Sequence, residues 1–507
     1  MRRRDLLLSS LALTVPAGGC GRPALDPVGD PAGEHAVLRL GLANPARNLD
    51  PRLATDATSE RVNRLLYRRL TEFDARGLPV PGIADWERLS ETRYRFRLRD
   101  QGRDFSDGAW LTARDVAATY RSILDPVTVS PHRTLLSLIR TIETPDSDTI
   151  DFTLVEPDPL FPAYLGIGIL PAAGIAAGRP FTEAPLGSGP FRLIGRLQPG
   201  RLRIERRRDA QVVELVTVKD PSVRVMKLLR GEVQILQNDL SPELVDWVAA
   251  RSGVRIETQP GTNCSYLGFN LDDPVTGDMR IRQAIAHGID REALLRHLFH
   301  DRARPAEGLL VPEHWAGHPG LAPHRHDPAL ARALLAQAGF GPDRPLGLTL
   351  KTSADPFRVR LATVIQSQLA AVGIRLSVRS FDWGTFFGDV KSGRFQLYAL
   401  TWVGIRTPDI FRYAFHSAAV PPDGANRGRY RSPAADALIA EARAQPELAD
   451  QAPLYRDLQA LLHGDLPALP LWFEDQVLAR RNEVRDYRLA ADGNYDGLGK
   501  VTLGARA

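Results

Sequence analysis

The sequence has few cysteines: among its 507 residues only Cys20 and Cys264 carry a thiol. Two thiols exclude a framework of several disulfides and a zinc site built from four cysteines. After residue 19 there is also no uninterrupted apolar segment of about 20 residues, the length that a membrane-spanning helix needs. We therefore expect the mature chain to be soluble.

Motifs of common enzyme chemistries are also missing. No H-E-x-x-H, G-x-S-x-G, P-loop or dinucleotide-binding motif occurs, and no two carboxylates stand out as a catalytic pair. His297 and His300 are three residues apart on an expected helix, but a third metal ligand is not obvious, so we interpret them as a surface pair. We predict no catalytic residue, no cofactor and no resident metal. Four further histidines gather in a loop-like region: His314, His318, His324 and His326.

The excess of positive charge is small. The formal net charge is +5, and residues 1–19, with three Arg and one Asp, contribute +2, which leaves +3. Nucleic-acid binding would call for a basic stripe with interleaved aromatic residues, so we exclude a nucleic-acid partner. A hydrophobic share of 43% and a charged share of 25% are typical of a soluble globular protein. The length predicts two or three packed units.

The N-terminus has the layout of an export signal. Residues 2–4 are arginines, residues 6–15 form a short apolar run, and the small residues 17–19 precede Cys20. This end resembles a bacterial lipoprotein signal, which implies cleavage after residue 19 and lipidation of Cys20. A secretory peptide cut nearby is the alternative. The paired arginines also resemble a twin-arginine signal, so both the Sec and the Tat export routes stay open.

The following residues, 20–35, are rich in Gly and Pro and lack apolar periodicity, which is typical of a flexible tether. Beyond them, alternating residues 36–42 and 94–99 predict strands, and the apolar spacing of residues 59–70 predicts a helix. Thr112 is expected to cap a helix over residues 113–123.

The second half of the chain alternates between strand and helix patterns, which favours a mixed or parallel sheet covered by helices. The expected strands are residues 346–351, 374–378 and 396–401. The expected helices are residues 223–229 with Gly231 as C-cap, 281–287, 291–298, 359–372, 386–390 and 449–462.

One segment is diagnostic of a family. Residues 105–116 read F-S-D-G-A-W-L-T-A-R-D-V and resemble the pattern F-x-D-G-x-x-hydrophobic-T-A-x-D-V. Further matching segments follow in order: residues 48–51, 54–56, 65–71, 81–86, 187–191, 228–233, 268–270, 282–286 and 289–291. Through these motifs the chain resembles the peptide/nickel class (family 5) of bacterial extracellular solute-binding proteins of ABC transporters, a class that includes the oligopeptide- and dipeptide-binding lipoproteins.

The resemblance implies an α/β, two-lobed periplasmic-binding-protein-like fold of class II, with an extra α+β subdomain on lobe 1. A ligand between two lobes touches both only in the closed state, so its binding shifts the population toward closure. The implied boundaries are residues 36–262 for lobe 1, about 75–180 for its subdomain, 263–470 for lobe 2 and 471–507 for a return to lobe 1. The implied crossings are near residues 260–267 and 469–473.

The resemblance also implies the ligand-contacting positions. They are Leu53, Ala54, Thr55, Tyr266, Trp402, Gly404, Arg406, Thr407, Asp409, Asn426, Arg427 and Tyr430.

Where this chain has Thr407, peptide-binding relatives commonly have an acidic residue that pairs with the peptide ammonium group. In this chain Asp409 and Asp382 remain as acidic neighbours of that position. We therefore predict that Arg406 or Arg427 binds an acidic ligand group through a bidentate fork. Solvated or structural loop arginines are the alternative. Trp402 either stacks on ligand or belongs to the core, and Cys264 is expected to be a small buried hydrophobe.

The implied protein is a periplasmic, lipid-anchored monomer and not an enzyme. It captures a short peptide and passes it to the permease of an ABC importer. The alternatives are the same fold with a metal chelate, opine, glycoside or antibiotic-like solute, a signalling receptor, or a secreted hydrolase.

Overall fold

The computed structural model describes residues 37–504. The expected signal peptide, Cys20 and the tether lie outside these residues. Within them, eleven strands form one large mixed sheet. Its order is β15 (Ile374–Phe381), β14 (Leu346–Ser353), β16 (Leu397–Trp402), β12 (Val254–Phe269), β17 (Ala468–Arg481), β11 (Ile235–Gln237), β1 (Leu38–Leu42), β10 (Val212–Thr217), β9 (Arg201–Arg206) and β8 (Phe191–Gln198), with β13 (Ala303–Pro305) paired to β17.

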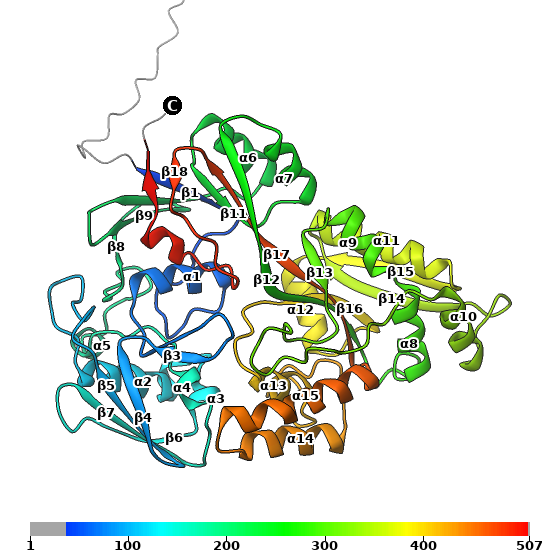
Figure 1. Ribbon diagram of the computed structural model, residues 1–507, viewed down its shortest axis with the longest axis horizontal. Coiled ribbons are helices and arrows are strands. Elements are labelled where there is room, and N and C mark those ends of the chain that lie inside the picture. Colours follow the sequence, from blue (N-terminus) through cyan, green and yellow to red (C-terminus); the bar gives the residue numbers. More distant parts are fainter. Residues whose placement is uncertain (1–36, 505–507) are drawn as a thin grey trace, which may run out of the picture. The chain divides into compact units, whose positions relative to one another are not determined.

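Two long strands, β12 and β17, run antiparallel side by side through the middle of this sheet (Figure 1). Near its C-terminal end β17 pairs with β11, through Leu478 to Arg480, and near its middle it pairs with β13, through Trp472 to Glu474. Between these partners the β12–β17 register shifts, at Gln259 to Asn263. Gly261 lies in this irregular stretch, where a Cβ would overlap the carbonyl oxygen of Glu474. Glycine lets the two backbones approach this closely.

A second, four-stranded antiparallel sheet has the order β4 (Ala84–Ser90), β5 (Arg93–Leu98), β7 (Thr149–Leu154) and β6 (Ile139–Glu143). The alternation of residues 94–99 predicts β5 correctly, because Tyr94, Phe96 and Leu98 are buried. Helix α2 (Ala113–Leu124) packs on this sheet, and Tyr120 meets Phe152 edge-to-face at 5.7 Å. The predicted Thr112 N-cap is confirmed.

The family-diagnostic segment at residues 105–116 has a structural role. Asp115 accepts hydrogen bonds from the backbone N–H of Thr112 at 2.8 Å and of Ala172 at 2.7 Å. The first bond closes the N-terminus of α2, and the second ties it to α5 (Ala172–Ala176).

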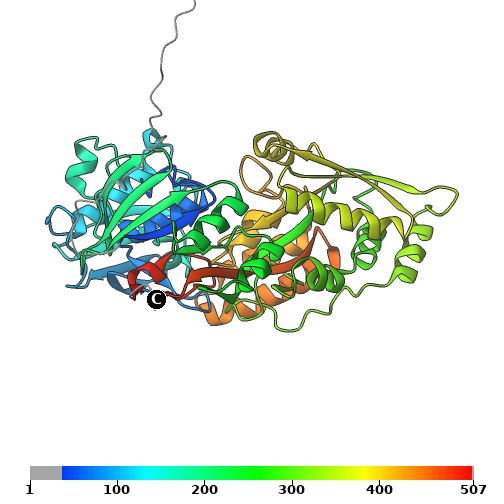
Figure 2. The same cartoon turned by 90° about the horizontal axis from the view of Figure 1, so that it is seen from above.

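The predicted βα alternation of the second half is confirmed, with ends within five residues of those expected. Strands β14 and β15 are parallel and joined by α11 (Pro356–Ala370), which covers them (Figure 2). The accompanying helices are α8 (Met279–Gly288), α9 (Arg291–Leu298), α10 (Pro328–Gln337), α12 (Trp383–Lys391), α13 (Asp409–Phe415), α14 (Pro433–Ala444) and α15 (Leu448–Asp465). The apolar faces of α8, α9 and α10 share a core with the buried Trp472 and Leu267, whereas those of α13, α14 and α15 belong to a separate, larger core.

The helix expected over residues 59–70 is shorter than predicted. Helix α1 spans Ala57–Leu66, and Leu70 lies outside it although it is buried. In a helix continued to residue 70, the Leu66 carbonyl would accept from the Leu70 N–H. It accepts instead from the N–H of Gly189 at 2.9 Å. This non-local hydrogen bond competes with the helix, and apolar spacing cannot reveal it.

The remaining elements are short or flank the sheets. Helix α6 (Pro221–Arg230) ends at Gly231, whose φ of 74° confirms the predicted C-cap. The others are η1 (Pro126–Thr128), α3 (Arg133–Leu136), α4 (Phe161–Tyr164), α7 (Pro242–Ala249), η2 (Asp496–Gly499), β2 (Thr71–Phe73), β3 (Pro79–Pro81), β18 (Val484–Arg485) and β19 (Thr502–Leu503). Among residues 37–504, none of the helices combines the length and the apolar character needed to cross a membrane.

Candidate functional site

Three of the predicted ligand-contacting residues meet beside the adjacent strands β12 and β16. The ring of Tyr266 stacks on that of Trp402, with centroids 5.9 Å apart and planes at 11°. Arg427 donates from Nη1 to the Tyr266 hydroxyl at 3.0 Å, and its guanidinium lies 4.7 Å from the centroid of the Trp402 ring. We call Tyr266, Trp402 and Arg427 the aromatic–arginine cluster.

Two residues outside the predicted ligand-contacting set complete the surroundings of this cluster. Tyr398 contacts Tyr266 edge-to-face, with ring centroids 5.7 Å apart, and Phe387 lies 5.3 Å from the Arg427 guanidinium. Tyr398 stands opposite Gly268 in the β12–β16 register, which only the strand pairing reveals. An aromatic wall around a cation is a strong setting for cation–π interaction.

Arg427 keeps its charge without a carboxylate partner. Its side chain is half-buried, and none of the ion pairs within residues 37–504 involves it. Burial acts to lower the pKa of Arg427, but Tyr266 and Tyr398 outweigh this effect and raise it. Tyr266 itself is buried under Trp402, so Trp402 and Arg427 are the members that a ligand could touch.

The other predicted residues of this loop have structural partners. Asn426 is buried, and its side chain donates to the carbonyls of His416 and Tyr430 and accepts from the Tyr430 N–H. The Tyr430 hydroxyl donates to the Asp465 carboxylate. Asn426 and Tyr430 thus hold the loop in place on both sides of Arg427.

Arg406 faces a different set of residues. Its guanidinium lies 5.5 Å from the centroid of the Phe73 ring, and Nη2 is 3.4 Å from a carboxylate oxygen of Asp492. Desolvation by the surrounding protein raises the pKa of the nearby Glu60 carboxyl. The positive charge of Arg406 opposes that rise. Arg406 therefore contacts segments from both ends of the chain, and its charge already has a carboxylate partner.

The other three predicted residues near Arg406 lie just before or at the start of α13. Asp409 pairs with Arg412 at 2.8 Å within α13, which satisfies its carboxylate locally. Thr407 is half-buried just before that helix, and Gly404 is exposed with a φ of 72°.

The segment before α1 has a separate environment. Leu53 is half-buried, Ala54 is buried and Thr55 is exposed. The backbone N–H groups of Leu53 and Ala54 both bond to the carbonyl of Asp50 at 3.1 Å. No contact recorded within residues 37–504 joins these three residues to the aromatic–arginine cluster.

A charged pair that contacts β12 at Ser265 was also missed. Arg358, at the start of α11, pairs with Glu474 on β17 at 2.7 Å, and Ser265 donates to the same carboxylate at 2.8 Å. Burial acts to raise the pKa of Glu474, but Arg358 outweighs it, so the carboxylate stays ionised. Arg358 and Glu474 are 116 residues apart, so a single sequence gives no signal that they meet.

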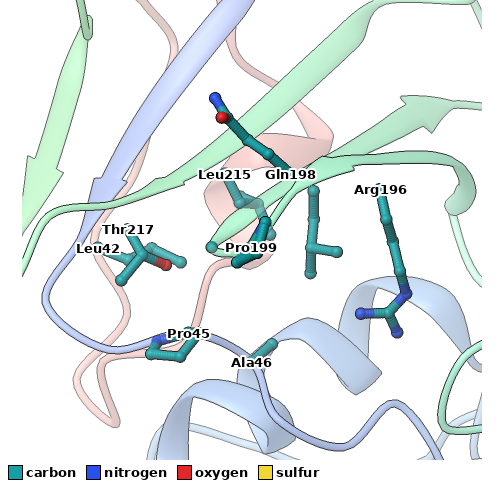
Figure 3. A pocket seen from close by; sticks show the side chains of 10 residues that line it. Leu42, Pro45, Ala46, Arg196, Gln198, Pro199, Leu215 and Thr217 are labelled. Carbon is teal, nitrogen blue, oxygen red and sulfur yellow. The ribbon is translucent and has the colours of Figure 1, made fainter.

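A cavity in another part of the described residues lies away from the aromatic–arginine cluster (Figure 3). It has a volume of about 310 Å³ and is lined by the end of β1 and the β8–β9 turn, including Leu42, Pro199 and Thr217. Arg196 at its edge already donates to the Thr182 carbonyl at 2.6 Å. None of the predicted residues lines this cavity. We favour the aromatic–arginine cluster as the site, because its polar group is unpaired and converges with aromatic faces.

Cys264 on β12 is fully buried, which confirms the expected small hydrophobe, and burial raises the pKa of its thiol. A buried thiol with a raised pKa is a poor nucleophile.

Comparisons with known proteins agree with this architecture. Di/tripeptide-binding protein 2 of Pseudomonas aeruginosa is 30% identical over 466 residues, which cover 84% of this chain and 87% of that protein. The dipeptide-binding protein of Escherichia coli is 26% identical over 482 residues, or 86% of this chain and 89% of that protein.

Solved structures of low sequence identity have the same fold. NikZ from Campylobacter jejuni in complex with Ni(L-His) superposes with a TM-score of 0.80 at 22% identity, covering 92% of this chain and 99% of that one. DppA from Helicobacter pylori in complex with the peptide STSA has a TM-score of 0.77 at 23% identity, covering 92% and 98%. The family described as "Bacterial extracellular solute-binding proteins, family 5 Middle" matches residues 51–420. The chain therefore belongs to the family 5 bacterial extracellular solute-binding proteins.

Proposed function

We propose that this protein captures a short peptide and delivers it to the permease of an ABC importer. One observation carries the peptide assignment: the half-buried, unpaired Arg427 held against Tyr266 and Trp402. A guanidinium with no carboxylate of its own suits the C-terminal carboxylate of a peptide. The names of the di/tripeptide- and dipeptide-binding relatives support a ligand of two or three residues.

The ligand is held, in this proposal, between a first lobe of residues 36–262 with 471–507 and a second lobe of residues 263–470. The first lobe carries the subdomain at about 75–180. The register shift of β12 at Gln259 to Asn263 supports a crossing there, because pairing weakens where strands lose register. Small-angle scattering should report a smaller radius of gyration after peptide is added, and an unchanged radius would count against closure.

Binding calorimetry with a dipeptide and with its C-terminal amide tests the role of Arg427. The free carboxylate should bind more tightly to the wild type by about tenfold or more, as a charge-assisted pair is worth roughly 1.5–3 kcal/mol. Arg427→Gln should lose this discrimination. Arg431→Gln is the matched control, since Arg431 is exposed and pairs with Asp272. If Arg427→Gln keeps the preference, this account of the peptide site is wrong.

The cargo can also be identified directly. Mass spectrometry of whatever co-purifies after gentle extraction should find a set of two- to three-residue peptides. A single non-peptide mass, such as a metal chelate, an opine or a glycoside, would move the assignment to that solute while leaving the family unchanged. Chemical change of the bound solute would instead favour a hydrolase.

We further propose that the protein is exported and anchored by lipid on Cys20, and that it acts as a monomer with no catalytic residue and no cofactor. The arginines, apolar run and small residues before Cys20 support export and lipidation. Cys20→Ser should release the protein from the membrane fraction. The double substitution Arg3→Lys/Arg4→Lys should block export only if the protein uses the twin-arginine route. Retention of Cys20→Ser in the membrane fraction would contradict lipidation.

A further inference from the structure

A glutamate and two histidines that are distant in sequence meet away from the proposed peptide site. Glu307 follows β13, His324 lies in the connection before α10, and His463 is in the last turn of α15. All three side chains are half-buried, and each offers a ligand atom within 4.8 Å of the other two. Within the described residues, this trio is the group of histidine, cysteine and acidic side chains that is close enough to hold a metal ion.

The spacing suits a small tetrahedral ion. Nδ1 of His324 is 3.6 Å from Oε2 of Glu307, and the rings of His324 and His463 have centroids 4.1 Å apart. Zinc bonds of about 2.0–2.2 Å to nitrogen and oxygen place neighbouring tetrahedral ligands about 3.4 Å apart. The His324–Glu307 pair is already near this value, and small side-chain rotations bring in His463.

The polar atoms around the trio leave metal-binding positions free. Nδ1 of His324 is buried and has no hydrogen-bond partner within residues 37–504. Arg291 donates to Oε1 of Glu307 at 2.7 Å, and the backbone N–H of His324 donates to Oε2 at 3.5 Å, which leaves Oε2 a second lone pair. Such outer-shell hydrogen bonds orient metal-binding carboxylates.

His463 is oriented in a similar way. Its Nδ1 is 3.2 Å from the carbonyl oxygen of Glu307. Because a carbonyl only accepts, Nδ1 donates, and the lone pair of the neutral ring is on Nε2. His463 also lies at the C-terminal end of α15, where the helix dipole favours a cation.

We propose that Glu307, His324 and His463 bind one Zn²⁺ ion, with the fourth position open to water. A neutral hydrogen-bonded cluster explains the contact less well, because it leaves the buried Nδ1 of His324 unsatisfied. The ion gives that nitrogen a partner and crosslinks the connection between β13 and α10 to the end of α15. The site stands independently of peptide binding.

Zn²⁺ titration by calorimetry tests the proposal, using full-length protein purified without a polyhistidine tag and treated with a chelator. The wild type should bind one equivalent, and Co²⁺ should give the visible absorption bands of a tetrahedral site. His324→Gln and His463→Gln should each weaken binding by at least about 100-fold, since even outer-shell changes cost 10- to 100-fold. His297→Gln is the matched control, because His297 is exposed on α9.

Circular dichroism in chelator checks that the variants are folded, and Glu307→Gln gives a third route if a histidine variant is not. Peptide affinity should stay within about twofold in all of them, which separates this test from that of the peptide site. Absence of Zn²⁺ binding by the wild type would overturn the proposal. Unchanged Zn²⁺ affinity in a folded His324→Gln/His463→Gln double variant would do the same.

Discussion

Nε2 of His314 donates a hydrogen bond to the backbone carbonyl of Arg406 at 3.2 Å. On the other side of the ring, Nδ1 accepts from the N–H of Ala316 at 3.1 Å. One nitrogen donates and the other accepts, which is the pattern of a neutral imidazole. His314 is buried, so this neutral ring holds the backbone of the loop that presents Arg406.

The stability of the protein should therefore fall in mild acid through His314. Burial lowers the pKa of His314 to about 4. The unfolded chain, with an ordinary histidine pKa of about 6.5, binds the proton first, so this contribution to the unfolding free energy is complete above pH 6.5 and is lost as the pH falls toward 4. The loss should be about 3 kcal/mol.

Urea unfolding at a series of pH values measures this loss. His314→Gln should be less stable than the wild type at pH 7.5 and should lose less stability between pH 6.5 and pH 4. His318→Gln, a histidine from the same connection, is the control. If both variants follow the wild-type curve, His314 does not couple folding to protons.

Trp402 should contribute to ligand affinity, because its ring holds the Arg427 guanidinium in place. Trp402→Leu removes the aromatic face beneath Arg427, and cation–π contacts are worth roughly 0.5–2 kcal/mol. We therefore expect peptide affinity to fall by about 2- to 30-fold in calorimetry. Trp110→Leu is the matched control, because Trp110 also lies against an arginine, Arg103, at 5.1 Å. Equal losses in both variants would point to general destabilisation.

Local sequence patterns predicted the elements well, and the site only in part. Periodicity found α9 and the strands β14 and β15, because one buried face per element leaves a repeat in the sequence. It extended α1 too far, because the N–H of Gly189 takes the Leu66 carbonyl that Leu70 would use in a longer helix.

The family resemblance placed Tyr266, Trp402 and Arg427 among the site residues, and the structure brings these three together. It gave no sign of the Arg358–Glu474 pair or of the meeting of His324 with His463. Such contacts depend on how distant segments pack, and neither spacing nor charge in one sequence records that packing.

The diagnostic segment at residues 105–116 should affect stability and not ligand affinity. Asp115→Ala removes the acceptor for the N–H groups of Thr112 and Ala172, and a helix cap with a buried hydrogen bond is worth about 2 kcal/mol. Asp107→Ala is the control in the same segment, since Asp107 is exposed and accepts from Ala109 at 3.0 Å. Urea unfolding and peptide calorimetry on both variants test this, and a selective loss of affinity in Asp115→Ala would contradict it.

Gly261 should tolerate no side chain. In Gly261→Ala the new Cβ overlaps the carbonyl oxygen of Glu474, so β12 and β17 must separate where their register already shifts. Such overpacking typically costs about 1–3 kcal/mol, and urea unfolding should show a loss of this size. Gly347→Ala on β14 is the matched control, because a Cβ there meets no atom within 4 Å. If the two variants are equally stable, the close approach of the strands at Gly261 does not constrain the fold. If Gly261→Ala is destabilised and also shows a smaller change in radius of gyration on binding peptide, this stretch takes part in lobe closure.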